Sequence, residues 1–293
     1  LGDSDTTVRR RACEAYVRSG IEAPVDPLMT LLAENDRWLR FAARLTLERI
    51  PVEKWKSRVI ESTDPYVVTE GLLALFRLGA ETYSPDEALR REAGLLERYD
   101  AFDTAQRLSV LRMIQLTLIA GGRGPVAGDI ADVLVKHFPS GDEAVDAESA
   151  RILAALQHHD AAEKIVAELE QASTRERAID YALTLRYLNV GWNRDLKSRL
   201  LAWYDGTRDW EGGHSFGPYL ANIVGAALER YQPAERAALL ADWPKHTHAA
   251  GLILENSTAA DVDGFETVVS SILNDREAQI DSGRRDQLIT VAV

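Results

Sequence analysis

The stretch of the sequence that most suggests chemistry is GHSFG at residues 213–217. Its pattern, G-x-S-x-G, holds the nucleophilic serine of many hydrolases, in which a sharp turn between a strand and a helix exposes the hydroxyl. A histidine base would have to follow it in the chain, and His246 and His248 are available. A hydrolase that uses Ser215 is therefore one interpretation of the sequence.

The residues around this motif favour a structural role instead. The segment that precedes it, 206–212, is polar and turn-like rather than an apolar strand. We expect Gly212 and Gly213 to form a turn before the next helix. Ser215 should cap that helix with its hydroxyl, and Phe216 should pack near its start.

Metal and thiol chemistry have little support in the sequence. Cys13 is the single cysteine, which excludes an internal disulfide and a zinc site built from several thiolates. His158 and His159 are adjacent and would point apart on a helix, whereas His246 and His248 could share a metal only in an extended segment. We expect neither a bound metal nor a cofactor.

The composition limits the class of protein. The chain has 293 residues, of which 46% are apolar, and a net charge of −12. Such a field repels nucleic acid, because phosphates are bound by clustered lysine and arginine. Arg9, Arg10 and Arg11 are adjacent, but three charges on one helix are typical of a solvated face. No stretch approaches the roughly 18 apolar residues of a membrane-spanning helix, so we expect neither nucleic-acid binding nor membrane insertion.

Three early segments align without gaps and indicate a helical repeat. They begin at Leu1, Leu32 and Ile60, with spacings of 31 and 28 residues. Each has a helix-capping aspartate, apolar residues at every fourth position, and a small residue that lets a neighbouring helix approach. Shorter helices that begin near Pro24 and Pro51 separate them. The aligned sets are Asp5, Asp36 and Asp64; Val8, Leu39 and Val67; Ala12, Ala43 and Gly71; and Tyr16, Leu47 and Leu75.

Residues 5–12 read Asp-x-x-Val-Arg-x-x-Ala and 36–43 nearly match that pattern, whereas the third copy has Val68 in place of the arginine. The pattern resembles the second helix of HEAT repeats. The resemblance implies an all-α, right-handed α–α superhelix of HEAT-like helical hairpins. We expect Ala43 to be buried between helices, and Arg9 to lie toward the surface or to pair with an acidic residue of the next repeat.

Helical signals continue beyond the clear repeats. Ser84–Glu87 and Ser173–Glu176 have the pattern of capping boxes. The break AGGRGP separates HEAT-like repeats at 1–120 from divergent helical repeats at 121–293, with one continuous solenoid as the alternative. No sheet is expected, and the β-prone LITVAV at 288–293 is interpreted as the start of a further helix. Apolar stripes predict long helices at about 102–120, 147–157, 174–188 and 218–230.

A second set of features lies in residues 191–223, namely Trp192, Asn193, Trp203, Tyr204, Gly212, Gly213, Ser215 and Phe216. This segment resembles one in large, exported multidomain proteins of environmental bacteria, in which HEAT repeats lie between a sugar-dehydrogenase-like β-propeller and a c-type haem domain. The resemblance implies a module of a redox protein, periplasmic or exported. The haem motif Cys-x-x-Cys-His is absent here, so no haem is expected. Leu1 lies inside a repeat, and we expect a piece of a longer protein.

Together these features favour a non-catalytic scaffold that binds a protein partner or positions flanking domains of its parent chain, since stacked repeats expose a long surface. Trp55, Trp192 and Trp203 are expected to bridge helices. The alternatives are the Ser215 hydrolase and a HEAT-like DNA glycosylase, which would need a basic groove that the net charge argues against. The residues that we assign to the interaction surface are Arg9, Trp38, Arg40, Trp210 and His214.

Overall fold

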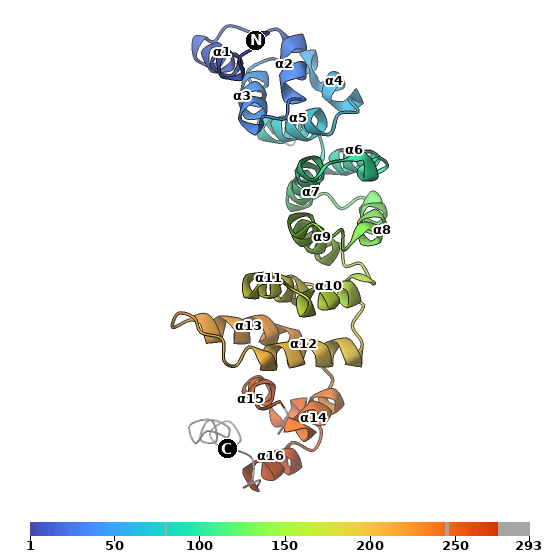
Figure 1. The fold of residues 1–293 in the computed structure, drawn as a ribbon. Coiled ribbons are helices and arrows are strands. Elements are labelled where there is room, and N and C mark those ends of the chain that lie inside the picture. Colours follow the sequence, from blue (N-terminus) through green and yellow to red (C-terminus); the bar gives the residue numbers. More distant parts are fainter. Residues whose placement is uncertain (80, 244–245, 275–293) are drawn as a thin grey trace. The chain divides into compact units, whose positions relative to one another are not determined.

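A computed structural model describes residues 1–79, 81–243 and 246–274 of the chain. Within these residues every regular element is a helix, and no strand is present (Figure 1). The prediction of an all-α chain is therefore confirmed for the part that the structure describes. The segment LITVAV at 288–293 lies outside it.

The helices fall into two compact units, Leu1–Ile152 and a second that begins at Leu153, so the division lies inside one helix, α9. The helices up to and including α9 are α1 (Thr6–Ser19), α2 (Val25–Leu32), α3 (Arg37–Leu47), η1 (Val52–Lys54), α4 (Lys56–Glu61), α5 (Pro65–Leu78), α6 (Pro85–Leu96), η2 (Tyr99–Ala101), α7 (Thr104–Ile119), α8 (Val126–His137) and α9 (Glu143–Ala155). Those that follow are α10 (Ala161–Glu170), α11 (Arg175–Arg186), α12 (Arg194–Gly206), α13 (Phe216–Leu228), α14 (Pro233–Ala241), α15 (Thr247–Glu255), η4 (Ala259–Asp261) and α16 (Phe265–Asn274).

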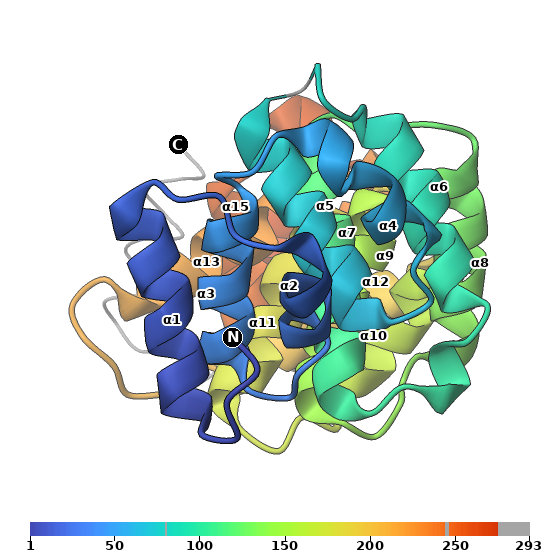
Figure 2. The ribbon, with the colours of Figure 1, turned by 90° about the horizontal axis from the view of Figure 1, so that it is seen from above.

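In unit 1 the helices form two layers (Figure 2). Helices α1, α3, α5 and α7 pack against one another in chain order, and α2, α4 and α6 each pack against the longer helix that follows. Helix α8 continues the second layer by packing against α6. Consecutive packing of helical hairpins is the arrangement expected of an α-solenoid.

The three aligned aspartates begin their helices as predicted. The side chains of Asp5, Asp36 and Asp64 accept hydrogen bonds of 2.6–3.2 Å from two backbone N–H groups in the first turns of α1, α3 and α5. Each aspartate has the extended backbone that lets a side chain fold back onto the helix. These N–H groups have no partner inside the helix, so the aspartate determines where each helix starts.

The small residues in the middle of these helices allow close packing. Ala43 is fully buried, as predicted, and Gly71 is buried at the equivalent position of α5. A Cβ atom on Gly71 would lie 2.1 Å from Cγ1 of Val59, so α4 and α5 approach too closely for a side chain here. Val8 departs from the aligned pattern because 48% of it is exposed, whereas its counterpart Leu39 is buried.

One of the two predicted capping boxes is present. The Ser84 hydroxyl accepts from the Glu87 N–H at 3.2 Å, and the Glu87 carboxylate accepts from the Ser84 N–H at 3.1 Å. The prediction of a box at Ser173–Glu176 is wrong, because α11 begins one residue later than expected. Thr174 is the N-cap and accepts from the Arg177 N–H at 3.2 Å, which puts arginine where the box needs a carboxylate.

In unit 2 the hairpins stack in a similar order. Helices α11, α13 and α15 pack in chain order, α12 packs against α10, α13 and α15, and α14 packs against α15 and α16. The four long helices predicted from apolar stripes correspond to α7, α9, α11 and α13, and the AGGRGP break connects α7 to α8 within unit 1. None of the described helices combines the length and the apolar character that a membrane span requires.

Candidate functional site

A groove between α1 and α3 of unit 1 exposes aromatic side chains. Trp38 and Phe41 are 56% and 44% exposed, although both belong to a well-packed helix. An exposed tryptophan in a concave setting is typical of a protein contact site. The groove has a volume of about 320 Å³ and is lined by Arg10, Glu14, Val17, Arg18, Trp38, Phe41, Ala42 and Leu45.

Helix periodicity explains why α3 leaves these residues open. The repeat positions Leu39 and Ala43 are fully buried against the rest of unit 1. Trp38, Phe41 and Leu45 are spaced by three and four residues, so they form a second apolar stripe on a different side of the same helix. The sequence predicts Trp38 and Arg40 as the surface residues of this helix, and the spacing of three and four residues is the signal that identifies Phe41 as the neighbour of Trp38.

The groove lies in a basic part of an acidic chain. The carboxylate of Glu14 lies among Arg10, Arg11 and Arg18. The hydrogen bond from Arg11, together with the positive charges of the three arginines, lowers the pKa of Glu14. The rim therefore keeps a positive excess, which favours negative groups at its edges. Three arginines of α1 and α3, namely Arg9, Arg40 and Arg44, pair with carboxylates outside these two helices. The charged residues that line the groove itself are Arg10, Arg18 and Glu14.

The two arginines that the sequence assigned to the interaction surface differ in position. Arg9 is half-buried and forms the expected pair with an acidic residue of the next repeat, Glu34. Arg40 is only 8% exposed, which corrects its assignment to an exposed surface. Its guanidinium lies 3.8 Å from the Tyr66 ring centroid and donates to the carbonyl oxygen of Glu34 at 2.7 Å, so it secures the turn between α2 and α3.

The other assigned surface residues, Trp210 and His214, belong to unit 2. Trp210 is half-buried, and its ring packs edge-to-face with the ring of Trp203, with 6.0 Å between the ring centroids. The guanidinium of Arg175 lies 5.2 Å from the centroid of the Trp210 ring. Trp203 thus joins the end of α12 to the loop that follows it. His214 is exposed in that loop and directly precedes the N-cap residue of α13.

The G-x-S-x-G motif lies between two helices. Residues 207–215 form a loop from the end of α12 to the start of α13, and Phe216 packs its ring against Gly212. Ser215 is the N-cap residue of α13, but its side chain accepts no capping hydrogen bond, so the predicted cap is wrong. The reason is its backbone, with φ −90° and ψ 2°, which is turn-like rather than extended. The turn runs through His214 and Ser215 and is closed by a hydrogen bond of 2.9 Å from the Phe216 N–H to the Gly213 carbonyl.

The histidines downstream of Ser215 make their contacts with α12. The ring of His248 stacks on Tyr204 at 4.3 Å, and Nδ1 of His246 lies 3.9 Å from a carboxylate oxygen of Asp205. Among the described residues, no three His, Cys, Asp or Glu side chains gather closely enough to hold a metal ion. Cys13 is buried, and burial raises the pKa of its thiol.

Comparison of the chain with protein-family models, with curated proteins and with solved structures gives no significant match. The all-helical fold and its repeat-like packing therefore stand on the structure itself. The likeness to HEAT repeats stays a prediction from the sequence.

Proposed function

We propose that this chain is a non-catalytic, HEAT-like scaffold that binds an apolar segment of protein in the groove between α1 and α3. The segment belongs to a separate partner or to a flanking domain of the parent chain. The observation that carries the proposal is the exposure of Trp38 and Phe41 in a groove with an arginine-rich rim.

The chemistry of the groove indicates what it binds. Covering Trp38 and Phe41 removes apolar surface from water, which contributes roughly 25 cal/mol per Å². Tryptophan and arginine are also the residues most enriched where binding energy concentrates. Arg10, Arg18 and Arg37 favour carboxylates at the edges of the contact. The bound segment therefore has apolar anchors flanked by aspartate or glutamate.

The setting of Ser215 supports a role without catalysis, because a helix precedes its loop where a nucleophile elbow has a strand. The resemblance of residues 191–223 supports a place within a multidomain redox protein, which gives the scaffold flanking domains to hold. Its compartment would then be periplasmic or exported, like that of the parent.

A selection from a random peptide library on the immobilised chain tests the proposal. We expect enriched peptides to combine aromatic or aliphatic anchors with acidic residues, and to lose at least about tenfold in affinity with Trp38→Ala, since a tryptophan hot spot is worth roughly 2 kcal/mol or more. Tyr187→Ala is the matched control, because Tyr187 is an exposed aromatic residue of unit 2. It should leave binding unchanged.

Two results would contradict the proposal. Peptides whose affinity is the same for the Trp38→Ala variant would show that the groove is not the binding site. Binding of a single-stranded oligonucleotide that Trp38→Ala removes would favour a nucleic-acid-binding protein, because bases also stack on aromatic side chains beside arginine.

A further inference from the structure

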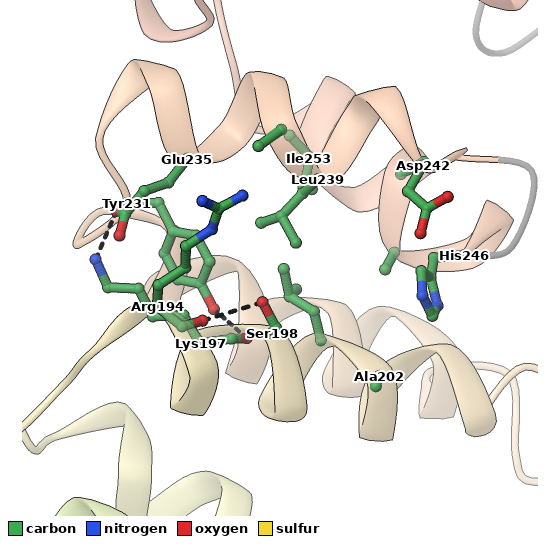
Figure 3. Close-up of a pocket in the computed structure, with 14 residues that line it drawn as sticks. Arg194, Lys197, Ser198, Ala202, Tyr231, Glu235, Leu239, Asp242, His246 and Ile253 are labelled. Atoms are coloured by element: carbon green, nitrogen blue, oxygen red, sulfur yellow. Dashed lines mark hydrogen bonds and ion pairs between the residues drawn. The ribbon is translucent and has the colours of Figure 1, made fainter.

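A cavity in unit 2 lies between α12, α14 and α15, with a volume of about 250 Å³ (Figure 3). Helices α12 and α14 face each other across it, and α15 closes its side. Its size is just below the roughly 300–1,000 Å³ of ordinary small-molecule pockets, so a ligand has to be short. The lining residues that matter for its chemistry are Arg194, Lys197, Tyr231, Glu235, Leu239 and Ile253.

The middle of the cavity is apolar. Leu201 of α12 and Ala249, Ala250 and Ile253 of α15 are buried, and Leu239 of α14 projects into the space between them. An apolar wall of this kind takes up a hydrocarbon group but leaves a polar one without a partner. It therefore selects ligands with an apolar body.

The polar groups at one end of the cavity are already bonded to one another. The Lys197 ammonium donates to the Glu235 carboxylate at 2.6 Å and to the Arg230 carbonyl at 2.9 Å. The Tyr231 hydroxyl donates to the Lys197 carbonyl at 2.8 Å, and burial raises the pKa of Tyr231, so this group stays neutral. These contacts neutralise Glu235 before any ligand arrives.

Arg194 adds a positive charge at the same end. Its side chain extends from the first turn of α12 toward α14, and no hydrogen bond or ion pair with another described residue engages its guanidinium. Burial by itself raises the pKa of Glu235, but the hydrogen bonds from Lys197 and Gln232 and the charges of Lys197 and Arg194 outweigh it and lower that pKa. Among the described residues that line this end, Arg194 and Lys197 carry two positive charges and Glu235 carries one negative charge, so one positive charge is left over.

The opposite end has a different character. Asp242 and His246 lie there, separated from Arg194 by Leu239 and Ile253 (Figure 3). The guanidinium of Arg194 attracts an anionic group to its own end of the cavity. The cavity thus offers one anion site followed by an apolar channel.

We propose that this cavity binds a short apolar monocarboxylate, with the carboxylate paired to Arg194 and the hydrocarbon chain against Leu239 and Ile253. The site lies entirely within unit 2 and does not depend on the groove between α1 and α3. Planar carboxylates match the paired N–H donors of a guanidinium, which makes arginine a specific partner for them.

Titration of the whole chain with hexanoate, followed by calorimetry and by the amide NMR signals of Ala249 and Ala250, tests the site. We expect saturable binding of hexanoate at millimolar concentration, and binding of hexan-1-ol and hexylammonium at least about tenfold weaker, because a hydrogen bond to a charged group is lost. Equal binding of hexanoate and hexan-1-ol, or no saturable binding of hexanoate, would overturn the proposal.

Two variants and a control locate the ligand. Arg194→Gln keeps a good helix former at an exposed position and should weaken hexanoate at least about tenfold while leaving hexan-1-ol unchanged. Ala202→Phe narrows the mouth of the cavity and should abolish binding of both. Arg208→Gln removes an exposed arginine outside the cavity and should have no effect. Unchanged hexanoate affinity in either of the first two variants would show that the ligand binds elsewhere.

Discussion

Two successive turns of unit 1 are held by arginines that come from different helices. In the α2–α3 hairpin, Arg40 of α3 donates to the carbonyl oxygens of Glu34 and Asn35 at 2.7 and 3.0 Å. The residue that secures the turn therefore belongs to the hairpin itself. It is also the arginine of the repeat pattern.

In the α4–α5 hairpin the aligned position is Val68, which is fully buried and cannot donate. The carbonyl oxygen of Ile60 instead accepts from Arg91 of α6 at 2.6 Å, and the same guanidinium bonds the carbonyl of Ser62. Carbonyl groups at the end of a helix need donors from outside it. In both hairpins a guanidinium lies at this place in space, although it comes from different places in the sequence.

In unit 2 arginines also bond carbonyl groups at helix ends, but these are the ends of α11, α13 and α15, the helices that pack in chain order. Arg230 bonds the carbonyl oxygen of Arg186 at the end of α11. Arg236 of α14 donates to the carbonyl oxygen of Leu228, at the end of α13, at 2.7 Å. It also donates to the carbonyl oxygen of Asn256, at the end of α15, at 3.0 Å. The arginine that bonds a helix end thus occupies different sequence positions along the chain, while the helical packing persists.

The largest loss of stability is expected when the small residue in the middle of α5, Gly71, is enlarged, and a smaller loss is expected at the equivalent residue of α3, Ala43. Gly71→Leu should lower the free energy of unfolding by about 3 kcal/mol or more, because even a Cβ atom there collides with the buried Val59. Ala43→Leu should cost about 1–3 kcal/mol, since Ala43 already accommodates a methyl group. Urea denaturation followed by circular dichroism measures both. A smaller loss for Gly71→Leu than for Ala43→Leu would show that α4 and α5 move apart easily.

The next prediction compares two glutamates that face helices of the first layer. Glu70 is paired with Arg44 at 2.8 Å, whereas Glu92 is fully buried and, among the described residues, bonded only to the Thr117 hydroxyl. Burial raises the pKa of Glu92 to about 8. The folded chain thus keeps this proton longer than the unfolded chain does, so the associated stability is present below about pH 4.5 and is lost as the pH rises to about 8.

Glu92→Gln should remove that loss. The variant should be more stable than the parent by roughly 4 kcal/mol at pH 8 and nearly equal to it at about pH 4, because raising a pKa from 4.5 to about 8 corresponds to about 1.4 kcal/mol for each pH unit between the two values. Urea denaturation at a series of pH values measures the difference. A constant difference across the series would mean that Glu92 does not titrate in this range.

Removal of the Arg91 guanidinium tests whether the turn of the α4–α5 hairpin needs this donor. Arg91→Met should cost about 1–2 kcal/mol, since it leaves the carbonyl groups of Ile60 and Ser62 without their donor. Arg90→Met is the control, because Arg90 is its exposed neighbour, and should change stability by less than about 0.5 kcal/mol. Equal effects of the two substitutions on the thermal midpoint would show that the turn does not need Arg91.

The smallest effect is expected at Ser215, which contrasts with the capping aspartates. Ser215→Ala should change the free energy of unfolding by less than about 0.5 kcal/mol, because the hydroxyl makes no capping bond. Asp36→Ala should cost about 0.5–2 kcal/mol, because its carboxylate accepts two. We also expect no labelling of Ser215 by a fluorophosphonate probe. Labelling would revive the hydrolase interpretation.

The sequence predicts the helices better than the surfaces. Caps such as Asp36 and small residues such as Ala43 act on their own helix or its nearest neighbour, so their role is visible in the local pattern. The burial of Arg40 depends on Tyr66, in the next hairpin, and this contact has no local signal. The cavity beside Arg194 arises where α12 and α14 leave space between them, which only the tertiary structure reveals.

The reach of Arg91 across a hairpin boundary has a consequence for cooperativity. A residue of α6 completes the turn before α5, so the second hairpin has its full set of bonds only when the third is folded. In a repeat protein such coupling between neighbours determines how many repeats unfold together. Fraying of α6 would weaken the α4–α5 turn as well. A fragment that ends between α5 and α6 would contain both helices of the second hairpin but would lose the bond from Arg91 to Ile60.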